Sequence, residues 1–195
     1  MKNTYIALLR GINAGGANSL PMKDFVGLLE GMGLRNIKTY IQTGNAVFQA
    51  KESDAAELPA TIKTRIKHSH GFAPEVVLLR LDELESAIAS NPYPEADSDP
   101  KALHLIFFSC TPKTPDLTAL EKIRKDSERF LLTGRVFYFY APEGVGRSKL
   151  FSRIEKSLGV VGTARNWRTA CKILEMAQQI AAADAAYVVV DESGY

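Results

Sequence analysis

The same order of short apolar runs and amphipathic segments occurs twice along this chain of 195 residues. In the first half, four short apolar runs are typical of strands: residues 5–9, 38–41, 46–49 and 75–79. Two segments between them predict helices, residues 21–32 and 53–70. Thr43-Gly44-Asn45 has the composition of a tight turn. The predicted order is β-α-β-β-α-β, which is that of the ferredoxin-like arrangement.

The second half repeats most of this order after a connecting helix, residues 82–90, and an acidic, proline-rich linker, residues 91–100. A strand, a helix, two strands and two helices are expected next: residues 103–109, 115–128, 130–132, 136–140, 148–158 and 167–183. A last apolar run, residues 187–190, predicts the closing strand. The sequence therefore predicts an α+β fold of two ferredoxin-like (βαββαβ-type) subdomains packed together, residues 1–90 and 91–195. The second subdomain has an inserted C-terminal helix.

The composition is that of an ordinary water-soluble protein, with 46% hydrophobic and 24% charged residues. The longest strongly apolar run, residues 103–110, is far shorter than the roughly 20 residues that span a bilayer. Arg10 interrupts the first apolar run, so no signal peptide is expected. Cys110 and Cys171 lie far apart and form no disulfide framework. These features predict a cytoplasmic protein that has no membrane partner.

The positive charge is concentrated in one segment, Gly146–Lys172. It holds seven lysines and arginines against one glutamate, a net charge of +6, whereas the whole chain carries only +2. The only tryptophan, Trp167, lies in this segment between Arg165 and Arg168. A local basic field around one aromatic ring is typical of a site for an anion. The segment indicates where the protein acts but not which reaction, if any, occurs there.

Four short motifs follow one another along the chain: LLRGINAGG at residues 8–16, TYIQTGN at 39–45, SKL at 148–150 and TARNW at 163–167. In this order and spacing they resemble the bacterial domain-of-unknown-function family numbered 1697. The resemblance extends from about Thr4 to Glu175 and implies a compact α+β fold with two subdomains. It implies no activity, so function has to be argued from the residues.

The first two motifs contain six candidate ligand-binding residues: Arg10, Asn13, Gly15, Gly16, Gln42 and Asn45. Glycines let a backbone approach a ligand closely, and successive N–H groups can form an anion-binding nest. The alternative is that these glycines only shape the connection from a strand to a helix. The amides of the second motif can recognise a base edge or a carbonyl. Alternatively, they serve only the tight turn.

The last two motifs contain six more candidates: Arg147, Ser148, Lys149, Arg165, Asn166 and Trp167. Arginine binds phosphate or carboxylate through two hydrogen bonds, and lysine acts as a point charge. Ser148 and Asn166 are equally suited to helix N-caps, and a serine nucleophile at Ser148 has no identifiable base. Trp167 either stacks on a base or sugar or anchors the core between subdomains.

Three functions are consistent with these residues. The first, which we prefer, is a binding module for an anionic or phosphorylated ligand, a nucleotide or a short nucleic acid, in a cleft between the subdomains. The second is an enzyme acting on a small phosphorylated or carboxylated substrate, clamped by Arg10, Arg147, Lys149 and Arg165. The third is a protein-interaction or structural module.

The sequence identifies no catalytic residue and no cofactor. The three histidines, His68, His70 and His104, lack metal-ligand spacing, so no metal site is predicted. Six aromatic residues on two expected strands belong either to an exposed RNA-binding face or to the core: Phe107, Phe108, Phe137, Tyr138, Phe139 and Tyr140. The ligand, the oligomeric state and the role of the tail after Ala183 stay open.

Overall fold

The computed structural model describes residues 2–192 and, within this range, the side chains of residues 3–183. The chain divides into two units. The first contains the residues up to Glu85 and those from Lys172 onward, and the second is Ser86–Cys171. Each unit contains one four-stranded antiparallel sheet. The predicted boundary between residues 90 and 91 stays a prediction.

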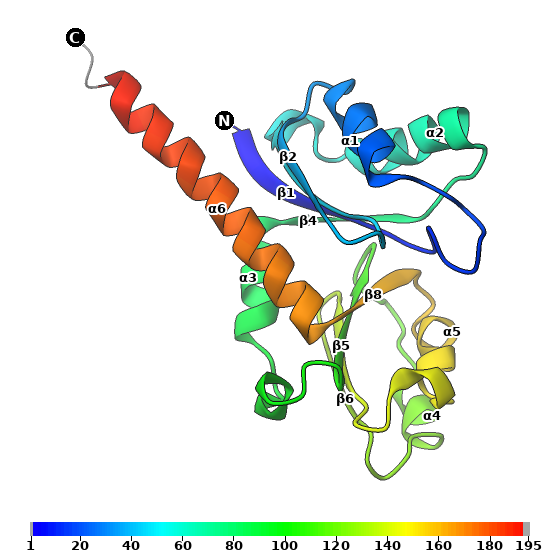
Figure 1. The fold of residues 1–195 in the computed structure, drawn as a ribbon. Coiled ribbons are helices and arrows are strands. Elements are labelled where there is room, and N and C mark those ends of the chain that lie inside the picture. Colours follow the sequence, from blue (N-terminus) through cyan, green and yellow to red (C-terminus); the bar gives the residue numbers. More distant parts are fainter. Residues whose placement is uncertain (1, 193–195) are drawn as a thin grey trace. The chain divides into compact units, whose positions relative to one another are not determined.

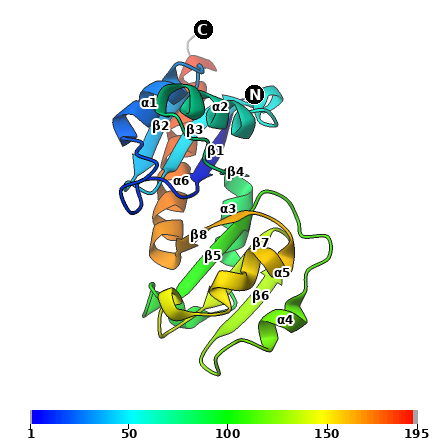
Figure 2. The ribbon, with the colours of Figure 1, turned by 90° about the vertical axis from the view of Figure 1, so that its right-hand side faces the viewer.

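The first unit has its elements in the predicted order (Figure 1). Its strands are β1 (Lys2–Leu9), β2 (Arg35–Tyr40), β3 (Asn45–Lys51) and β4 (Val76–Arg80). Its helices are α1 (Met22–Glu30) and α2 (Leu58–His70), which cover one face of the sheet (Figure 2). The strand order is β2-β3-β1-β4. Strand alternation turns Tyr5, Ala7 and Leu9 toward these helices, where they form a buried core with Phe25 and Ile62.

The predicted helix at residues 53–70 was wrong at its start. Residues 52–54 form a separate 3-10 turn, η1 (Glu52–Asp54), and α2 begins at Leu58. Pro59 then stands in the first turn of α2, where the missing N–H breaks no helical hydrogen bond. The helix ends at Gly71, whose φ of +80° is the left-handed conformation typical of such ends.

The second unit also contains four strands and short helices: β5 (Leu103–Phe108), α4 (Leu117–Glu121), β6 (Arg129–Thr133), β7 (Val136–Tyr140), α5 (Ile154–Leu158) and β8 (Gly162–Asn166). The strand order is β6-β7-β5-β8, and α4 and α5 lie over one face of this sheet (Figure 2). Three 3-10 turns connect these elements: η2 (Pro94–Asp97), η3 (Val145–Arg147) and η4 (Phe151–Arg153).

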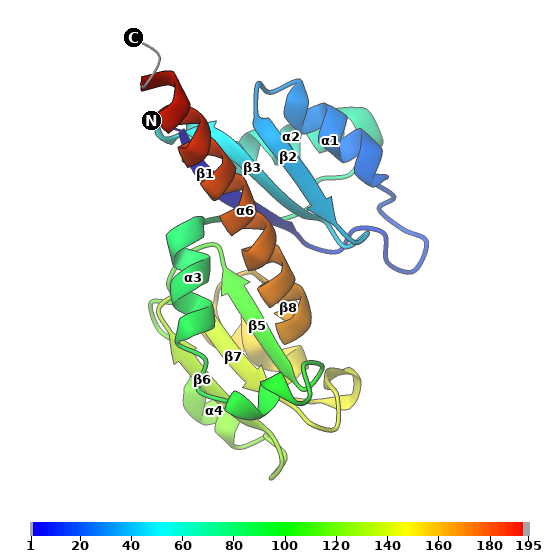
Figure 3. The same ribbon diagram turned by 60° about the vertical axis from the view of Figure 1, so that its left-hand side comes forward.

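Two longer helices belong partly to each unit. Helix α3 (Leu81–Ala89) enters the second unit at Ser86, and α6 (Trp167–Glu192) leaves it after Cys171. Tyr138 on β7 donates its hydroxyl to the carbonyl of Ala87, 2.8 Å away, which fixes the last turn of α3 beside the sheet (Figure 3). Burial raises the pKa of the Tyr138 hydroxyl to about 12, so it stays a donor at neutral pH.

The predicted closing strand at residues 187–190 was wrong, because this segment lies within α6. An alanine-rich stretch precedes it, and a helix already under way overrides the strand preference of a short valine run. The fourth strand of the second sheet is β8, which pairs with β5. The helix predicted as an insertion therefore follows a completed sheet.

Two other predicted helices were too long. Only Leu117–Glu121 of residues 115–128 is helical, because the Glu128 carboxylate accepts a hydrogen bond from the Lys125 N–H, 3.0 Å away, and holds a turn there. Residues 148–158 divide into η4 and α5. Five of the six strand aromatics belong to the core rather than to an exposed face: Phe107, Phe108, Phe137, Tyr138 and Phe139 are each no more than 1% exposed. The sixth, Tyr140, is half-buried.

Candidate functional site

The first two motifs interlock at one end of the first sheet. The Leu9 N–H donates to the carbonyl of Gly44, 2.8 Å away, and the side chain of Asn13 donates from Nδ2 to the carbonyl of Gln42, also at 2.8 Å. Ile12 is buried beside this contact. The loop between β1 and α1 and the turn between β2 and β3 therefore form one structural unit, although 29 residues separate Asn13 from Gln42.

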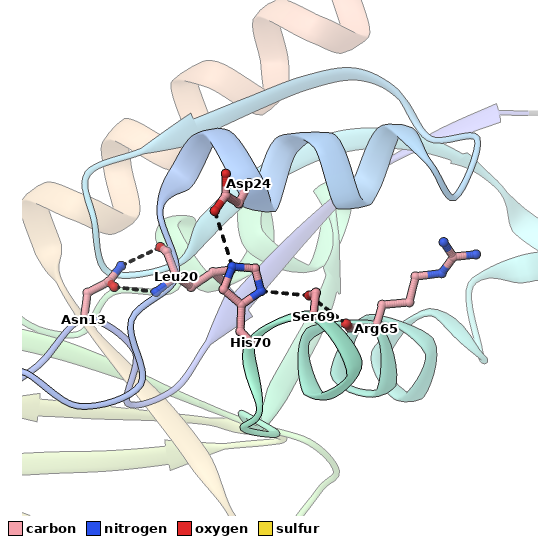
Figure 4. A network of polar contacts seen from close by, with 6 residues as sticks. All are labelled: Asn13, Leu20, Asp24, Arg65, Ser69 and His70. Atoms are coloured by element: carbon pink, nitrogen blue, oxygen red, sulfur yellow. Dashed lines mark hydrogen bonds and ion pairs between the residues drawn. The ribbon is translucent and has the colours of Figure 1, made fainter.

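Asn13 uses its amide to close its own loop. Oδ1 accepts from the Leu20 N–H at 2.8 Å, and Nδ2 donates to the Leu20 carbonyl at 2.9 Å (Figure 4). Gly15 and Gly16, both exposed, have φ of +60° and +79° and lie between Ala14 and Ala17, whose backbones are hydrogen-bonded at 3.2 Å. Two consecutive positive φ angles are the conformation of a type I′ turn. This geometry agrees with the shaping role that the sequence left open for the glycines.

The second motif divides into an internal and an exposed part. Asn45 is 1% exposed, and its Nδ2 donates to the Tyr40 carbonyl at 2.9 Å and to Thr43 Oγ1 at 3.0 Å. Gln42 and Arg10 are exposed. Beside them, Ile41 is 47% exposed and has a φ of +49°, a strained conformation for a β-branched residue. Ile41 lies in the second motif but was not among the candidate binding residues.

A further polar network lies where α2 ends beside the start of α1 (Figure 4). His70 Nδ1 is 2.7 Å from Ser69 Oγ, and Nε2 is 3.4 Å from Asp24 Oδ2. Ser69 Oγ donates to the Arg65 carbonyl at 2.9 Å, so the hydroxyl accepts from His70 rather than giving it a proton. That direction is the reverse of what a serine nucleophile requires. The network therefore joins two helix ends.

Four exposed cations lie in and around the third motif, in the second unit. Arg147, Lys149, Arg153 and Lys156 are exposed, and none of them has an ion-pair partner among the residues that the structure describes. The one acid of the segment, Glu155, accepts a hydrogen bond from the Gly162 N–H at 3.0 Å. Ser148 is 6% exposed and accepts from the Phe151 N–H at 3.0 Å, as an N-cap does.

The fourth motif is mostly internal. Asn166 caps α6 by accepting from the Thr169 N–H at 2.9 Å. Trp167 is 8% exposed and donates its Nε1 hydrogen to Asp97 Oδ1, 3.1 Å away. Arg165 is also 8% exposed and donates from Nη1 to Thr163 Oγ1 at 2.7 Å and to the Ala164 carbonyl at 2.8 Å. Burial lowers the pKa of Arg165 to about 10.

The second sheet separates these two motifs. Ala164 packs with Leu150 and Ile154 in the core beneath α4 and α5, and the exposed cations lie on that side. Because side chains alternate along a strand, Arg165 points to the opposite face. Within the second unit the exposed cations and Arg165 therefore do not form one surface. A cleft between the predicted subdomains stays a prediction.

The fold is that of an α+β protein with two antiparallel sheets, and the candidate residues include an exposed basic segment. Residues 2–138 match the family model described as protein of unknown function DUF1697, and the chain belongs to this family. The predicted membership of this family is thus confirmed, and the matched range contains the first two of the four motifs.

One solved structure that resembles the chain is that of the conserved bacterial protein SP0830 from Streptococcus pneumoniae. The TM-score is 0.70 at 22% sequence identity, and the match covers 91% of this chain and 99% of that one. At this identity the likeness concerns the fold alone. The comparison with curated proteins found no match. Within residues 2–192, no helix combines the length and the apolar character that crossing a bilayer requires.

Proposed function

We propose that this chain is a binding module for a phosphorylated anion, a nucleotide or a short nucleic acid, held on the exposed cations of the η3–α5 segment. The observation that carries the proposal is that Arg147, Lys149, Arg153 and Lys156 are exposed without an ion-pair partner among the described residues. Arginine and lysine in this state are available for charge-assisted hydrogen bonds to phosphate oxygens.

The backbone supports the proposal by fixing two of these cations. Arg147 and Lys149 flank Ser148, which is buried and accepts a hydrogen bond from the Phe151 N–H, so both side chains start from an ordered turn. An ordered start lowers the conformational entropy that a side chain loses on binding. In the first unit, Arg10 is exposed in the loop that carries the Gly15–Gly16 turn, and it stays a candidate contact for an anion. Because Trp167 and Arg165 are buried, we assign them a structural role rather than a role in binding.

We expect a labelled ten-nucleotide single-stranded DNA to bind with an affinity that falls steeply with salt. Four phosphate contacts predict a slope of about −3 in a plot of log K against log salt concentration. Replacing two cations, Arg147→Ala with Lys149→Ala, should weaken binding at low salt by about tenfold and reduce the slope by about 1.4. Fluorescence anisotropy between 50 and 200 mM KCl measures both.

Lys101→Ala is the matched control, because Lys101 is an exposed cation of the same unit outside this segment. It should change neither the affinity nor the slope. Binding that ignores salt, or that the double variant leaves unchanged, contradicts the proposal. Competition with inorganic pyrophosphate distinguishes a site for a small phosphorylated ligand from a site for a nucleic acid. Pyrophosphate at the same concentration as the DNA should displace the DNA only from a small-ligand site.

Two finer assignments are part of the same proposal. We regard both units as ferredoxin-like, which the strand orders β2-β3-β1-β4 and β6-β7-β5-β8 support. We also assign the protein to the cytoplasm, because Cys110 and Cys171 are free thiols, as is usual in a reducing compartment.

A further inference from the structure

A small pocket lies in the first unit, on the face of the sheet opposite to α1 and α2. Its volume is about 290 Å³, at the lower end of the range for small-molecule sites. Thr4 on β1 and Gln49 on β3 line it, and these two residues lie directly opposite each other in the sheet. Since side chains alternate along a strand, Thr4 points away from Tyr5 and from the core beneath the two helices. Ala181 of α6, which belongs to the same unit, also lines the pocket.

Thr4 and Gln49 bring nearly buried polar groups without a hydrogen-bond partner to this pocket. Thr4 is 7% exposed, and its hydroxyl has no partner among the described residues. Gln49 is 3% exposed, and its Oε1 accepts from Asn36 Nδ2 at 2.6 Å. The two hydrogens of Gln49 Nε2 have no acceptor in the part of the chain that the structure describes. Polar groups at this depth are normally paired, so a ligand in the pocket can supply the missing partners.

The charged residues of the lining are already engaged with neighbouring side chains. Arg80 donates from Nε to Asp82 Oδ1 at 3.2 Å and from Nη1 to Glu52 Oε1 at 3.1 Å. Glu85 Oε1 accepts from Gln178 Nε2 at 3.0 Å. The second carboxylate oxygens of Asp82 and Glu85 have no partner among residues 3–183, so they can still accept hydrogen bonds. The pocket therefore offers both donors and acceptors to a ligand.

We propose that this pocket binds a small uncharged polyhydroxylated compound, such as a monosaccharide or an open-chain polyol. A hydroxyl group both donates and accepts, so neighbouring hydroxyls can pair with the Gln49 amide, the Thr4 hydroxyl and the free carboxylate oxygens at once. A ligand of this kind needs little apolar wall, which fits a lining whose apolar residues are Leu81 and Ala181. The site differs from the η3–α5 segment in unit and in the charge of its ligand.

The test compares five probes by ¹H–¹⁵N NMR titration of the full chain. D-Glucose and D-sorbitol are uncharged and carry several hydroxyls, and cyclohexanol carries one. D-Glucuronate and D-gluconate replace one hydroxymethyl group of glucose and of sorbitol with a carboxylate. Glucose or sorbitol should produce saturable shifts at residues 3–4, 49, 80–85 and 178–181, and the tighter of the two identifies a ring or an open chain as the ligand.

Cyclohexanol should not bind, because it makes only one of these hydrogen bonds. Each acid should bind at least fivefold more weakly than its uncharged parent, because Asp82 and Glu85 repel the added carboxylate.

Thr4→Val keeps the branched shape that suits a strand and removes the unpartnered hydroxyl. The variant should therefore fold with unchanged or higher stability in urea unfolding, while the affinity for the uncharged probe falls about fivefold. Thr39→Val is the matched control, a half-buried threonine of β2 outside the pocket, and should leave the affinity unchanged. Ala181→Leu fills the pocket from α6 and should abolish saturable binding.

The proposal is overturned when neither glucose nor sorbitol gives saturable shifts at these residues. Equal binding of cyclohexanol, or of an acid and its uncharged parent, does the same. An affinity that stays unchanged in Thr4→Val or in Ala181→Leu also contradicts it.

Discussion

Replacing Gly44 with alanine should lower the free energy of unfolding by about 2–4 kcal/mol. Gly44 has a φ of +80°, and a Cβ added there would lie 2.6 Å from Leu9 Cβ and 2.9 Å from Ile12 Cδ1. Leu9 Cβ is held by the backbone of β1 and cannot rotate away. The substitution therefore combines the cost of a left-handed backbone with that of an overfilled core. Urea unfolding measures the loss.

Gly15→Ala is the matched control for this prediction. Gly15 has a comparable φ of +60°, but nothing lies within 4 Å of the position of an added Cβ. Only the backbone cost applies there, so we expect a loss of about 1 kcal/mol. Equal losses in the two variants would mean that the chain around Gly44 yields, and that the close contact with Leu9 contributes nothing.

The turn around Gly44 also shows which parts of the fold could be predicted from the sequence. Glycine and asparagine at residues 44 and 45 predict a tight turn, and the apolar runs on both sides predict its two strands. These predictions succeed because the conformations of a turn and of a strand depend on residues that are neighbours in the sequence. The contact of Gly44 with Leu9 has no such signal. It depends on how strands distant in sequence pair, which local patterns do not encode.

Strand β8 was missed for a related reason. It alternates Thr163 and Arg165, both buried, with Ala164, so it lacks the apolar run by which strands are recognised. Arg165 is tolerated there because its guanidinium donates to Thr163 and to the carbonyl of Ala164. The sequence does not distinguish a buried arginine from a surface cation, so it predicts the same role for Arg165 as for Arg147 and Lys149.

The candidate residues with local roles were the predictable ones. Asn166 and Ser148 cap the segments that follow them, as their residue types allow, because a cap needs only the next three residues. Trp167 instead donates a hydrogen bond to Asp97, a residue 70 positions earlier in the segment predicted as a linker. Thr4 gave no signal at all, since an unsatisfied hydroxyl is a property of the folded surroundings.

The free energy of unfolding should depend on pH through the protonation of His104. Its Nδ1 is buried without a hydrogen-bond partner among the described residues, and its ring lies 6.0 Å from that of Phe151. Burial lowers the pKa of His104 to about 4, from 6.5 in an unfolded chain. Between these values the unfolded chain binds a proton that the folded protein does not. The free energy of unfolding therefore falls as the pH drops from about 6.5, by about 2 kcal/mol at pH 5.

His104→Leu keeps the volume and removes the titrating group, so the variant should lose this part of the pH dependence. We expect the stability difference between the variant and the natural protein to change by about 2 kcal/mol in the variant's favour between pH 7.5 and pH 5. Urea unfolding at the two pH values gives this difference, in which the carboxylates common to both proteins cancel. His68→Leu, at an exposed histidine, should show no such change. A difference that stays constant with pH would mean that His104 takes up its proton in the folded protein as readily as in the unfolded chain.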